Sequence, residues 1–249
     1  MELSELQQIC ENCRKCSLCE TRTNVVFGTG DPHADIMFVG EAPGENEDLT
    51  GIPFVGRAGQ LFDKYLIAVG LRREDVYIAN TIKCRPPKNR DPNPEEQAAC
   101  LDYLREQTRI INPKMIVCLG RISAYRIISP DFKITRDHGV FYERKGKILT
   151  AVYHPSALLR DPRKKDDMLA DMMKIKEKAD ELSGRKCYDT YNGSVIHGNN
   201  AFHYRNSQLY RDKSKAYKRY FYKRLFYVYN MRRTAVYDNE LVIRYRIFA

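Results

Sequence analysis

The chain has 249 residues, of which 30% are charged and 43% are hydrophobic, and its formal net charge is +10 at pH 7. A chain of this length can bury a full core and hold one or two domains. No apolar run approaches the ~18 residues of a membrane span, and the start MELSELQQIC lacks the basic-then-apolar order of a signal peptide, so we expect a cytoplasmic protein.

The positive charge is concentrated at one end of the chain. Residues 183–249 contain 14 Lys and Arg against 4 Asp and Glu, and they also hold 11 of the 17 tyrosines. We therefore expect a charge-balanced globular domain over residues 1–182 and a basic, Tyr-rich extension over residues 183–249. Its segment 213–224 has the basic and aromatic mixture that binds phosphates and stacks on bases. The alternative, which we favour, is a poorly ordered extension without such a role.

The N-terminal segment contains a regular series of cysteines. Apolar residues at helical spacing predict a short amphipathic helix over residues 3–9, followed by Cys10, Cys13, Cys16 and Cys19. Eight cysteines in a cytoplasmic protein favour metal ligands or buried thiols over disulfides. The C-x2-C spacing lets two thiolates reach one metal ion or cluster, and the repeat resembles the iron–sulfur spacing of bacterial ferredoxins. A metal or cluster site is predicted here, and the spacing leaves open which cysteines are its ligands.

Strand-like and helical patterns alternate through the rest of the domain. The predicted strands cover residues 34–39, 75–79 and 114–119, with a strand pair at 140–144 and 148–153. The predicted helices cover residues 59–69, 94–111, 121–128 and 163–182. Alternation with short connections is typical of an α/β fold, in which a largely parallel sheet is covered by helices on both faces.

Polar residues or glycines stand just past the ends of four predicted strands: Gly40-Glu41, Asn80, Gly120 and His154. The carboxyl ends of parallel strands meet at one edge of a sheet, where ligands of such folds bind. The first of these strand ends opens a polar segment, residues 40–48, that by itself could be a solvated surface loop. Convergence of four strand ends favours a pocket.

The side chains expected at this edge suit a planar heterocycle. An amide both donates and accepts hydrogen bonds, and an aromatic ring can stack on a base. An imidazole can stabilise an anion on a ring oxygen, while a carboxylate positions water. No Ser–His–Asp order, P-loop or dinucleotide fingerprint is present, so we predict a site for an N-glycosidic bond, built from Asn80, Phe54, His154 and the acids Glu41, Glu47 and Asp48.

Several motifs together resemble one known family. GEAPGENED, GIPFVGRAG, VYIAN, KCRPPKNR, IVCLG and YHPSALLR occur in this order within residues 1–180 and are similar to the family-4, iron–sulfur uracil-DNA glycosylases. The resemblance implies a three-layer α/β/α sandwich with a central, mostly parallel four-stranded sheet. It also implies a monomeric DNA-repair enzyme that flips uracil out of DNA and hydrolyses its N-glycosidic bond, and that carries a 4Fe-4S cluster. The alternative is a non-catalytic iron–sulfur nucleic-acid-binding protein of the same fold.

The resemblance also assigns residues. It implies that the cluster ligands are Cys13, Cys16, Cys84 and Cys100, which makes Cys10 and Cys19 bystanders. It implies that Asn80 reads uracil, Phe54 stacks on the ring, His154 donates to the uracil oxygen beside the broken bond, and Glu47 crowds the C5 position. Gly40, Glu41 and Ala42 match the loop that lines the pocket.

Two roles have more than one candidate. Other uracil glycosylases have an Asp where this chain has Ala42, so Glu41 is the best candidate for the water-positioning acid, with Glu47 and Asp48 as alternatives. The segment 156–160, with Ser156, Leu158 and Arg160, suits a loop that enters the duplex, although a core-packed turn is the alternative. Basic residues that could follow the phosphate path stand at positions 85, 88, 90, 160, 163, 164 and 165.

Overall fold

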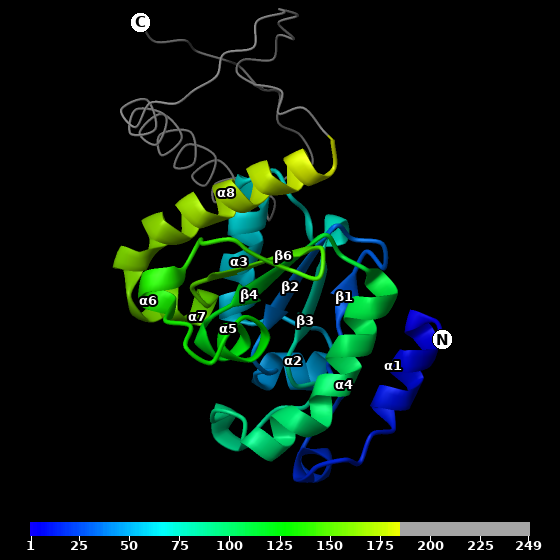
Figure 1. The fold of residues 1–249 in the computed structure, drawn as a ribbon. Helices are drawn as coiled ribbons and strands as arrows, with labels where there is room; N and C mark the ends of the chain where they lie inside the picture. The colour runs from blue at the N-terminus through cyan, green and yellow to red at the C-terminus, as the bar shows by residue number, and fades with distance from the viewer. Residues whose placement is uncertain (185–249) are drawn as a thin grey trace, which may run out of the picture. The chain divides into compact units, whose positions relative to one another are not determined.

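A computed structural model describes residues 1–184, which form a central sheet with helices on both faces (Figure 1). The expectations for the C-terminal extension lie outside the described residues. The strands are β1 (Thr29–Gly30), β2 (Ile36–Gly40), β3 (Tyr77–Asn80), β4 (Met115–Leu119), β5 (Tyr142–Arg144) and β6 (Lys147–Val152). Their order in the sheet is β1-β3-β2-β4-β6-β5.

The four central strands, β3, β2, β4 and β6, are parallel, which confirms the predicted four-stranded parallel core. The two edge strands, β1 and β5, pair antiparallel and bring the sheet to six strands. The predicted strand pair is the β5–β6 hairpin, which turns at Lys145 and Gly146, where both residues have positive φ. Because β6 is parallel to β4, this turn lies at the end of the sheet opposite the carboxyl ends of the parallel strands.

Eight α-helices occur within residues 1–184. They are α1 (Leu3–Glu11), α2 (Glu45–Thr50), α3 (Arg57–Ala68), α4 (Pro94–Ile111), α5 (Arg121–Ile127), α6 (Ile134–Asp137), α7 (Pro155–Arg160) and α8 (Lys165–Leu182). Helix α4 begins as the sequence predicts, with Asn93 as N-cap and the Glu96 carboxylate accepting from the Asn93 N–H at 2.7 Å. Among these helices, none combines the length and the hydropathy needed to cross a membrane.

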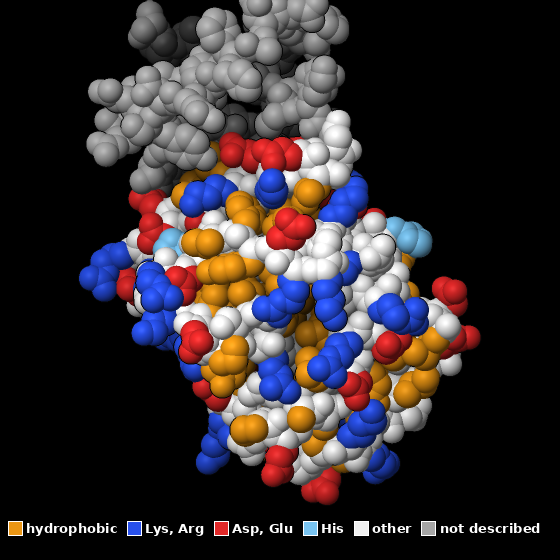
Figure 2. All heavy atoms as spheres, in the orientation of Figure 1, with side chains coloured by type: hydrophobic (Ala, Val, Ile, Leu, Met, Phe, Trp, Pro, Cys, Tyr) orange, Lys and Arg blue, Asp and Glu red, His pale blue; other side chains and the backbone are white. Residues whose placement is uncertain are grey.

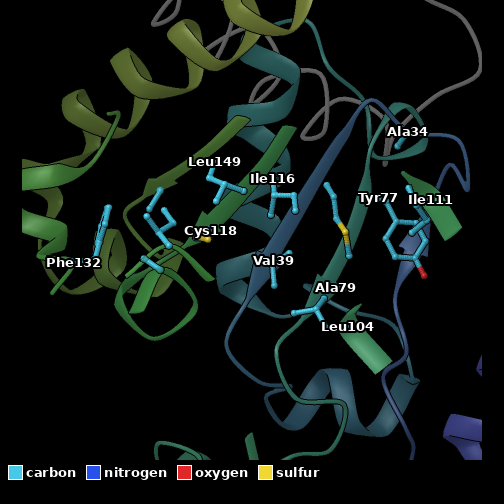
Figure 3. Packing of buried hydrophobic residues seen from close by; sticks show 14 residues of the cluster. Ala34, Val39, Tyr77, Ala79, Leu104, Ile111, Ile116, Cys118, Phe132 and Leu149 are labelled. Carbon is cyan, nitrogen blue, oxygen red and sulfur yellow. The ribbon is translucent and has the colours of Figure 1, made fainter. Parts of the chain in front are cut away.

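Alternate residues of each central strand pack against different helical layers. On one face, Met37 and Val39 of β2 belong to a buried cluster that also includes Leu104 of α4 and Ala124 of α5 (Figure 3). On the other face, the ring of Phe38 meets that of Phe62 of α3, with their centroids 5.0 Å apart. All five residues of β2 are buried, as expected for a parallel strand covered on both sides. The three-layer sandwich is therefore confirmed.

The structure differs from the sequence prediction in the segment after β2. The polar run predicted as a loop over residues 40–48 ends in a short helix, α2, which starts after Gly44. The side chain of Glu47 caps this helix by accepting from the Gly44 N–H at 3.1 Å. Glu45, Glu47 and Asp48 lie in the first turn, where acidic side chains interact favourably with the helix dipole. Part of the acidic character of this segment is therefore structural.

Candidate functional site

The four parallel strands end at the same edge of the sheet, as the sequence predicts. Gly40 is the register partner of Asn80 across β2 and β3. The Gly120 N–H, just after β4, donates to the carbonyl of Val152 at the end of β6 at 2.8 Å. His154 follows two residues later. The predicted residues Gly40, Asn80, Gly120 and His154 thus come from four separate strands to one place.

Gly40 leaves the space in which two side chains meet. A Cβ atom at Gly40 would lie 2.4 Å from Asn80 Oδ1 and 2.6 Å from Phe54 Cζ, closer than real Cβ contacts. Asn80 is 1% exposed, and its Oδ1 is a buried acceptor without a hydrogen-bond partner among residues 1–184. An unpaired buried acceptor costs about 1–3 kcal/mol. A ligand N–H at this position would remove that cost.

Phe54 is held in an unusual backbone conformation. Its φ is +55°, a backbone conformation that residues other than glycine rarely adopt. The Arg73 guanidinium donates to the carbonyl oxygens of Phe54 at 2.8 Å and of Pro53 at 2.5 Å, and it also binds the Asp63 carboxylate at 3.0 Å. The Phe54 ring lies 5.7 Å from the His154 ring, measured between centroids. The aromatic face is therefore fixed beside the imidazole.

His154 is a neutral hydrogen-bond donor in this arrangement. It is the N-cap of α7, and its Nδ1 accepts from the backbone N–H of Ser156 at 3.2 Å, with Ser156 Oγ at 2.7 Å. Since Nδ1 accepts, the proton of the neutral ring is on Nε2. Burial, followed by the positive charge of Arg160, lowers the pKa of His154 to about 4, against the opposing effect of Glu47. At neutral pH, His154 can donate from Nε2 without carrying a charge.

Glu41 has a carboxyl group suited to proton chemistry near neutral pH. Burial raises the pKa of Glu41 to about 7, with a smaller contribution from the Asp91 carboxylate and an opposing one from Arg121. Its main chain is fixed because the Glu41 carbonyl accepts from Thr81 Oγ1 at 2.7 Å and from the Ile82 N–H at 3.1 Å. A carboxyl group that titrates near pH 7 is typical of a general base or a water-positioning acid.

The other two acids of this segment have backbone partners. Glu47 Oε1 accepts from the N–H groups of Val55 at 2.9 Å and Gly56 at 2.7 Å, which ties α2 to the Phe54 loop. Asp48 is 3% exposed and accepts from the Thr23 N–H at 3.0 and 3.1 Å. Asp48 therefore joins α2 to the N-terminal segment, and this does not fit its prediction as an alternative water-positioning acid.

The segment after His154 forms the helix α7. The direction in which each side chain of this helix points changes the prediction that Leu158 contacts DNA. Leu158 is fully buried, so it does not fit the predicted DNA contact, whereas the next residue, Leu159, is 41% exposed. Arg160 is also exposed, while Ser156 is engaged with His154. The alternative of a core-packed turn therefore holds for Leu158 alone.

The predicted phosphate path includes several basic residues with acidic partners. Arg90 binds the buried Glu96 carboxylate at 2.6 and 2.9 Å, and Arg163 binds Asp161 at 2.9 Å. Arg90 therefore has a structural role at the start of α4. Figure 2 shows a group of Lys and Arg side chains in the middle of one face of the molecule.

The four predicted cluster ligands come from three parts of the chain. Cys84 and Cys100 are buried in one hydrophobic cluster against which Cys16 packs, and Cys13 packs against a second cluster that contains Cys10. Arg22 Nη1 donates to Cys84 Sγ at 3.2 Å. Burial raises the pKa of Cys84 to about 11 and raises that of Cys100.

This donor set fits a cluster of several irons. The four thiols of a 4Fe-4S cluster bind different irons, so they lie farther apart than the ligands of a single ion. The hydrogen bond from the Arg22 guanidinium to Cys84 Sγ suits a thiolate ligand, since a positive charge stabilises the deprotonated sulfur.

Sequence patterns do not reveal the roles of Arg73 and Ser156 in the site. Arg73 carries no motif and reaches the carbonyl oxygens of Pro53 and Phe54 only through the tertiary fold. The sequence suggests Ser156 only as a DNA contact, whereas in the structure it sets the His154 tautomer. The sequence also does not single out Lys83 and Gln107, two buried residues whose side chains are hydrogen-bonded to each other at 2.6 Å; the signal for Lys83 is its place in a mostly apolar segment next to Cys84.

Comparisons with known proteins identify the family of this chain. The family described as the uracil DNA glycosylase superfamily matches residues 27–175. The type-4 uracil-DNA glycosylase of Archaeoglobus fulgidus is 49% identical over 184 residues, which cover 70% of this chain and 90% of that protein. Proteins of the same description from Sulfurisphaera tokodaii and Thermotoga maritima are 46% and 48% identical, over 71% and 64% of this chain and 84% and 85% of theirs.

Proposed function

This chain belongs to the uracil DNA glycosylase superfamily, and we propose on that premise how its residues remove uracil from DNA. It is a uracil-DNA glycosylase, a hydrolase that cleaves the N-glycosidic bond between uracil and deoxyribose and leaves an abasic site. The target base leaves the stack to reach the edge of the sheet. The Asn80 amide, buried with an unpaired acceptor beside Phe54, is the observation that carries the site assignment.

Asn80 and Phe54 recognise the base in this proposal. Asn80 Oδ1 accepts from uracil N3–H and Nδ2 donates to uracil O4, a pattern that cytosine does not match. Phe54 offers a flat apolar surface for the ring. Gly40 is part of the same recognition site, because any side chain there would fill the space beside Asn80 and Phe54.

His154 and Glu41 carry the chemistry. As the bond to C1′ breaks, negative charge develops on the uracil ring, and His154 Nε2–H donates to O2, where part of that charge resides. Glu41 holds a water for attack on C1′, and its carboxylate offsets the positive charge of the sugar in the transition state. Water supplies the hydroxyl at C1′ and loses its proton to the Glu41 carboxylate, and the uracil ring leaves as an anion that later takes up a proton. A neutral His154 suits this role because it donates without already being a cation.

Glu47 and Ala42 complete the wall of the pocket. The Glu47 carboxylate is fixed by three backbone N–H groups, so it forms a rigid barrier at the uracil C5 position, where thymine has a methyl group. Rigidity is needed because an apolar pocket distinguishes one methyl group by only about 1–3 kcal/mol. Ala42 is partly buried and leaves the acid function to Glu41.

Cys13, Cys16, Cys84 and Cys100 would hold a 4Fe-4S cluster. Bound there, the cluster would cross-link the N-terminal segment, the loop after β3 and α4 through thiolate bonds, a structural role without a step in hydrolysis. The loop over residues 85–93 contains only the 3-10 turn Pro87–Asn89 as regular secondary structure. Arg22 on Cys84 Sγ supports thiolate ligation.

Uracil-containing DNA is the partner, and α7 is the element that meets it. Leu159 takes the place in the duplex that the sequence suggests for Leu158, since it is the exposed leucine of this helix. Arg160 is placed to contact a phosphate, and Ser156 contributes through His154.

The cytoplasmic location and the monomeric state remain predictions.

A uracil-containing oligonucleotide tests the function directly. After incubation with the protein, alkali should cleave the strand at the uracil position, and free uracil should appear in equal amount. The same strand with thymine should remain intact. An intact uracil strand would instead support a nucleic-acid-binding protein that lacks the activity.

Glu41 gives the reaction a dependence on pH. The reactive form is the carboxylate, so kcat/KM should rise as the pH increases through about 7, the pKa of Glu41. Glu41→Gln should lower kcat/KM and remove this rise. Asp91→Asn should shift the rise to lower pH and Arg121→Gln to higher pH, since these side chains act on the Glu41 pKa in opposite directions.

Thermal unfolding offers a control that does not depend on activity. The folded protein binds a proton at Glu41 between the ordinary pKa of 4.5 and about 7, so the parent protein should lose stability as the pH rises through this range. Glu41→Gln should be more stable than the parent at pH 8 and similar to it at pH 4. A pH profile identical in parent and Glu41→Gln would contradict the role of Glu41.

The cysteine variants test the ligand set. Cys84→Ser and Cys100→Ser should lose the visible iron–sulfur absorbance and the bound iron, while Cys10→Ser and Cys19→Ser should keep both. Cys10 is 1% exposed, so its variant should unfold at a lower temperature without losing iron. Loss of absorbance in the Cys10 and Cys19 variants, with retention in Cys84→Ser, would restore a ferredoxin-like ligand set.

A further inference from the structure

Lys83 is a buried lysine for which the reaction itself provides no role. Its side chain is 1% exposed, and Nζ donates to the main-chain oxygen of Asn80 at 3.0 Å and to Gln107 Oε1 at 2.6 Å. Nζ also lies 5.8 Å from the centre of the Phe27 ring. Both acceptors are neutral, so they do not balance the charge of the ammonium group. Burying such a charge is costly unless an opposite charge lies nearby.

The opposite charge would come from the cysteines. Lys83 directly precedes Cys84, and its backbone N–H is hydrogen-bonded to the Cys100 sulfur. The thiols whose charge would act on the Lys83 ammonium are those of Cys10, Cys84 and Cys100. Two of these three are the proposed cluster ligands. Thiolate ligation would therefore place negative charge within electrostatic range of the ammonium group.

Gln107 fixes the other side of Lys83. Its Nε2 donates to the Phe27 carbonyl at 2.9 Å and to the Tyr77 hydroxyl at 3.2 Å, which orients Oε1 toward Lys83 Nζ. Gln107 is fully buried and lies on α4, the helix that also carries Cys100. Lys83 is thus held between α4 and the turn that follows Asn80.

We propose that Lys83 is a positioning residue that connects the iron–sulfur cluster to the uracil pocket. Its ammonium group holds the Asn80 carbonyl, and thereby orients the amide that reads uracil, while its charge balances the thiolate ligands. This inference rests on the proposed function. It assigns one side chain to both sites, which the chain from Asn80 to Cys84 and the packing of Ala42 against the cluster of Cys84 and Cys100 also bring together.

Lys83→Met tests both halves of the inference. The hydrogen bond from a charged donor to the Asn80 carbonyl is lost, so kcat/KM on uracil-containing DNA should fall about 10- to 100-fold. Inhibition by free uracil should weaken by a similar factor, while affinity for undamaged DNA stays unchanged. The visible absorbance should remain, and the reduction potential of the cluster should fall, because removal of a nearby positive charge favours the oxidised form.

Two further variants separate positioning from general stability. Lys147 Nζ makes the same kind of contacts far from the pocket, to Asn112 Oδ1 at 2.7 Å and the Pro113 carbonyl at 2.9 Å, so Lys147→Met should lower the unfolding temperature only. Gln107→Glu keeps the Lys83–Asn80 hydrogen bond and adds a negative charge, but it loses the donation from Nε2 to the Phe27 carbonyl, so its unfolding temperature should also fall. It should lower the reduction potential and leave free-uracil inhibition within about twofold of the parent.

The outcomes distinguish this inference from the proposed function. A parent protein that neither excises nor binds uracil would contradict the function itself. A parent that does both, with Lys83→Met matching it in uracil inhibition and in reduction potential, would contradict only the role of Lys83. If Lys83→Met does not fold, Lys83→Gln, which removes the charge but keeps a polar side chain, takes its place, and a parental reduction potential together with parental uracil inhibition in that variant would overturn the inference.

Discussion

Replacing Asn80 by alanine should lower kcat/KM on uracil-containing DNA by roughly 10³-fold or more, the largest effect expected for a single side chain of this protein. In the proposed site, Asn80 supplies both a donor and an acceptor to the base, and its side chain is 1% exposed, so water competes little for these groups. A site built to pair with polar groups loses much more than the energy of one contact when that pairing is lost, because the substrate groups are then buried unpaired. The measurement is single-turnover excision at several enzyme concentrations.

The fold should tolerate this change. Asn80 Oδ1 has no partner in the described part of the protein, so alanine removes an unpaired buried acceptor rather than a hydrogen bond. Asn80→Ala should therefore keep the parent's iron content and unfold at an equal or higher temperature. Its affinity for DNA without uracil should also match the parent. An Asn80→Ala protein that excises uracil at the parental rate would contradict the assignment of the pocket.

His154→Ala should lower the rate of bond cleavage by about 10²- to 10³-fold with a smaller change in KM. The hydrogen bond from Nε2 strengthens as charge moves onto the uracil ring, so its loss affects the transition state more than the bound substrate. Ser156→Ala should cost only a few-fold, because the backbone N–H of Ser156 still holds Nδ1. His33→Ala, at an exposed position before β2, is the matched control and should behave as the parent.

The protonation state of His154 can be measured independently of rate. Nitrogen NMR of labelled histidine should show a neutral ring with its proton on Nε2 from pH 5.5 to 9, since the pKa of His154 is lowered to about 4. Ser156→Ala should weaken this tautomeric preference. A cationic imidazole at pH 7 would contradict the mechanism, because a charged ring would hold the leaving group by ion pairing instead.

Much of the fold is predictable from the sequence because its signals are local. The apolar run that ends at Gly40 predicts strand β2 without any tertiary information. In the same way, Asn93 as N-cap and Pro94 as the first helical residue predict the start of α4. The alternation of strands and helices then places the strand ends together, so the sequence alone assigns Asn80 and His154 to one edge of the sheet. The short antiparallel strand β1, with two residues, has no comparable signal.

The features that the sequence does not predict depend on long-range partners. Asp48 has the same local surroundings as Glu47, and only the position of Thr23 shows that it supports the N-terminal segment. Leu158 and Leu159 are adjacent in the six-residue helix α7, and the way this helix is turned toward the core decides which of them is buried. Arg73 and Lys83 act on main-chain carbonyl oxygens, which every residue has, so no sequence pattern identifies their targets.

The β5–β6 hairpin has a practical consequence for handling the enzyme. Its turn is exposed, a Cβ atom at Gly146 would meet nothing within 4 Å, and it lies at the opposite end of the sheet from the pocket. A fluorophore, an affinity tag or a small fused domain inserted between Lys145 and Gly146 should therefore leave both uracil excision and iron content unchanged. An insertion of the same length between Cys84 and Pro94 should abolish both.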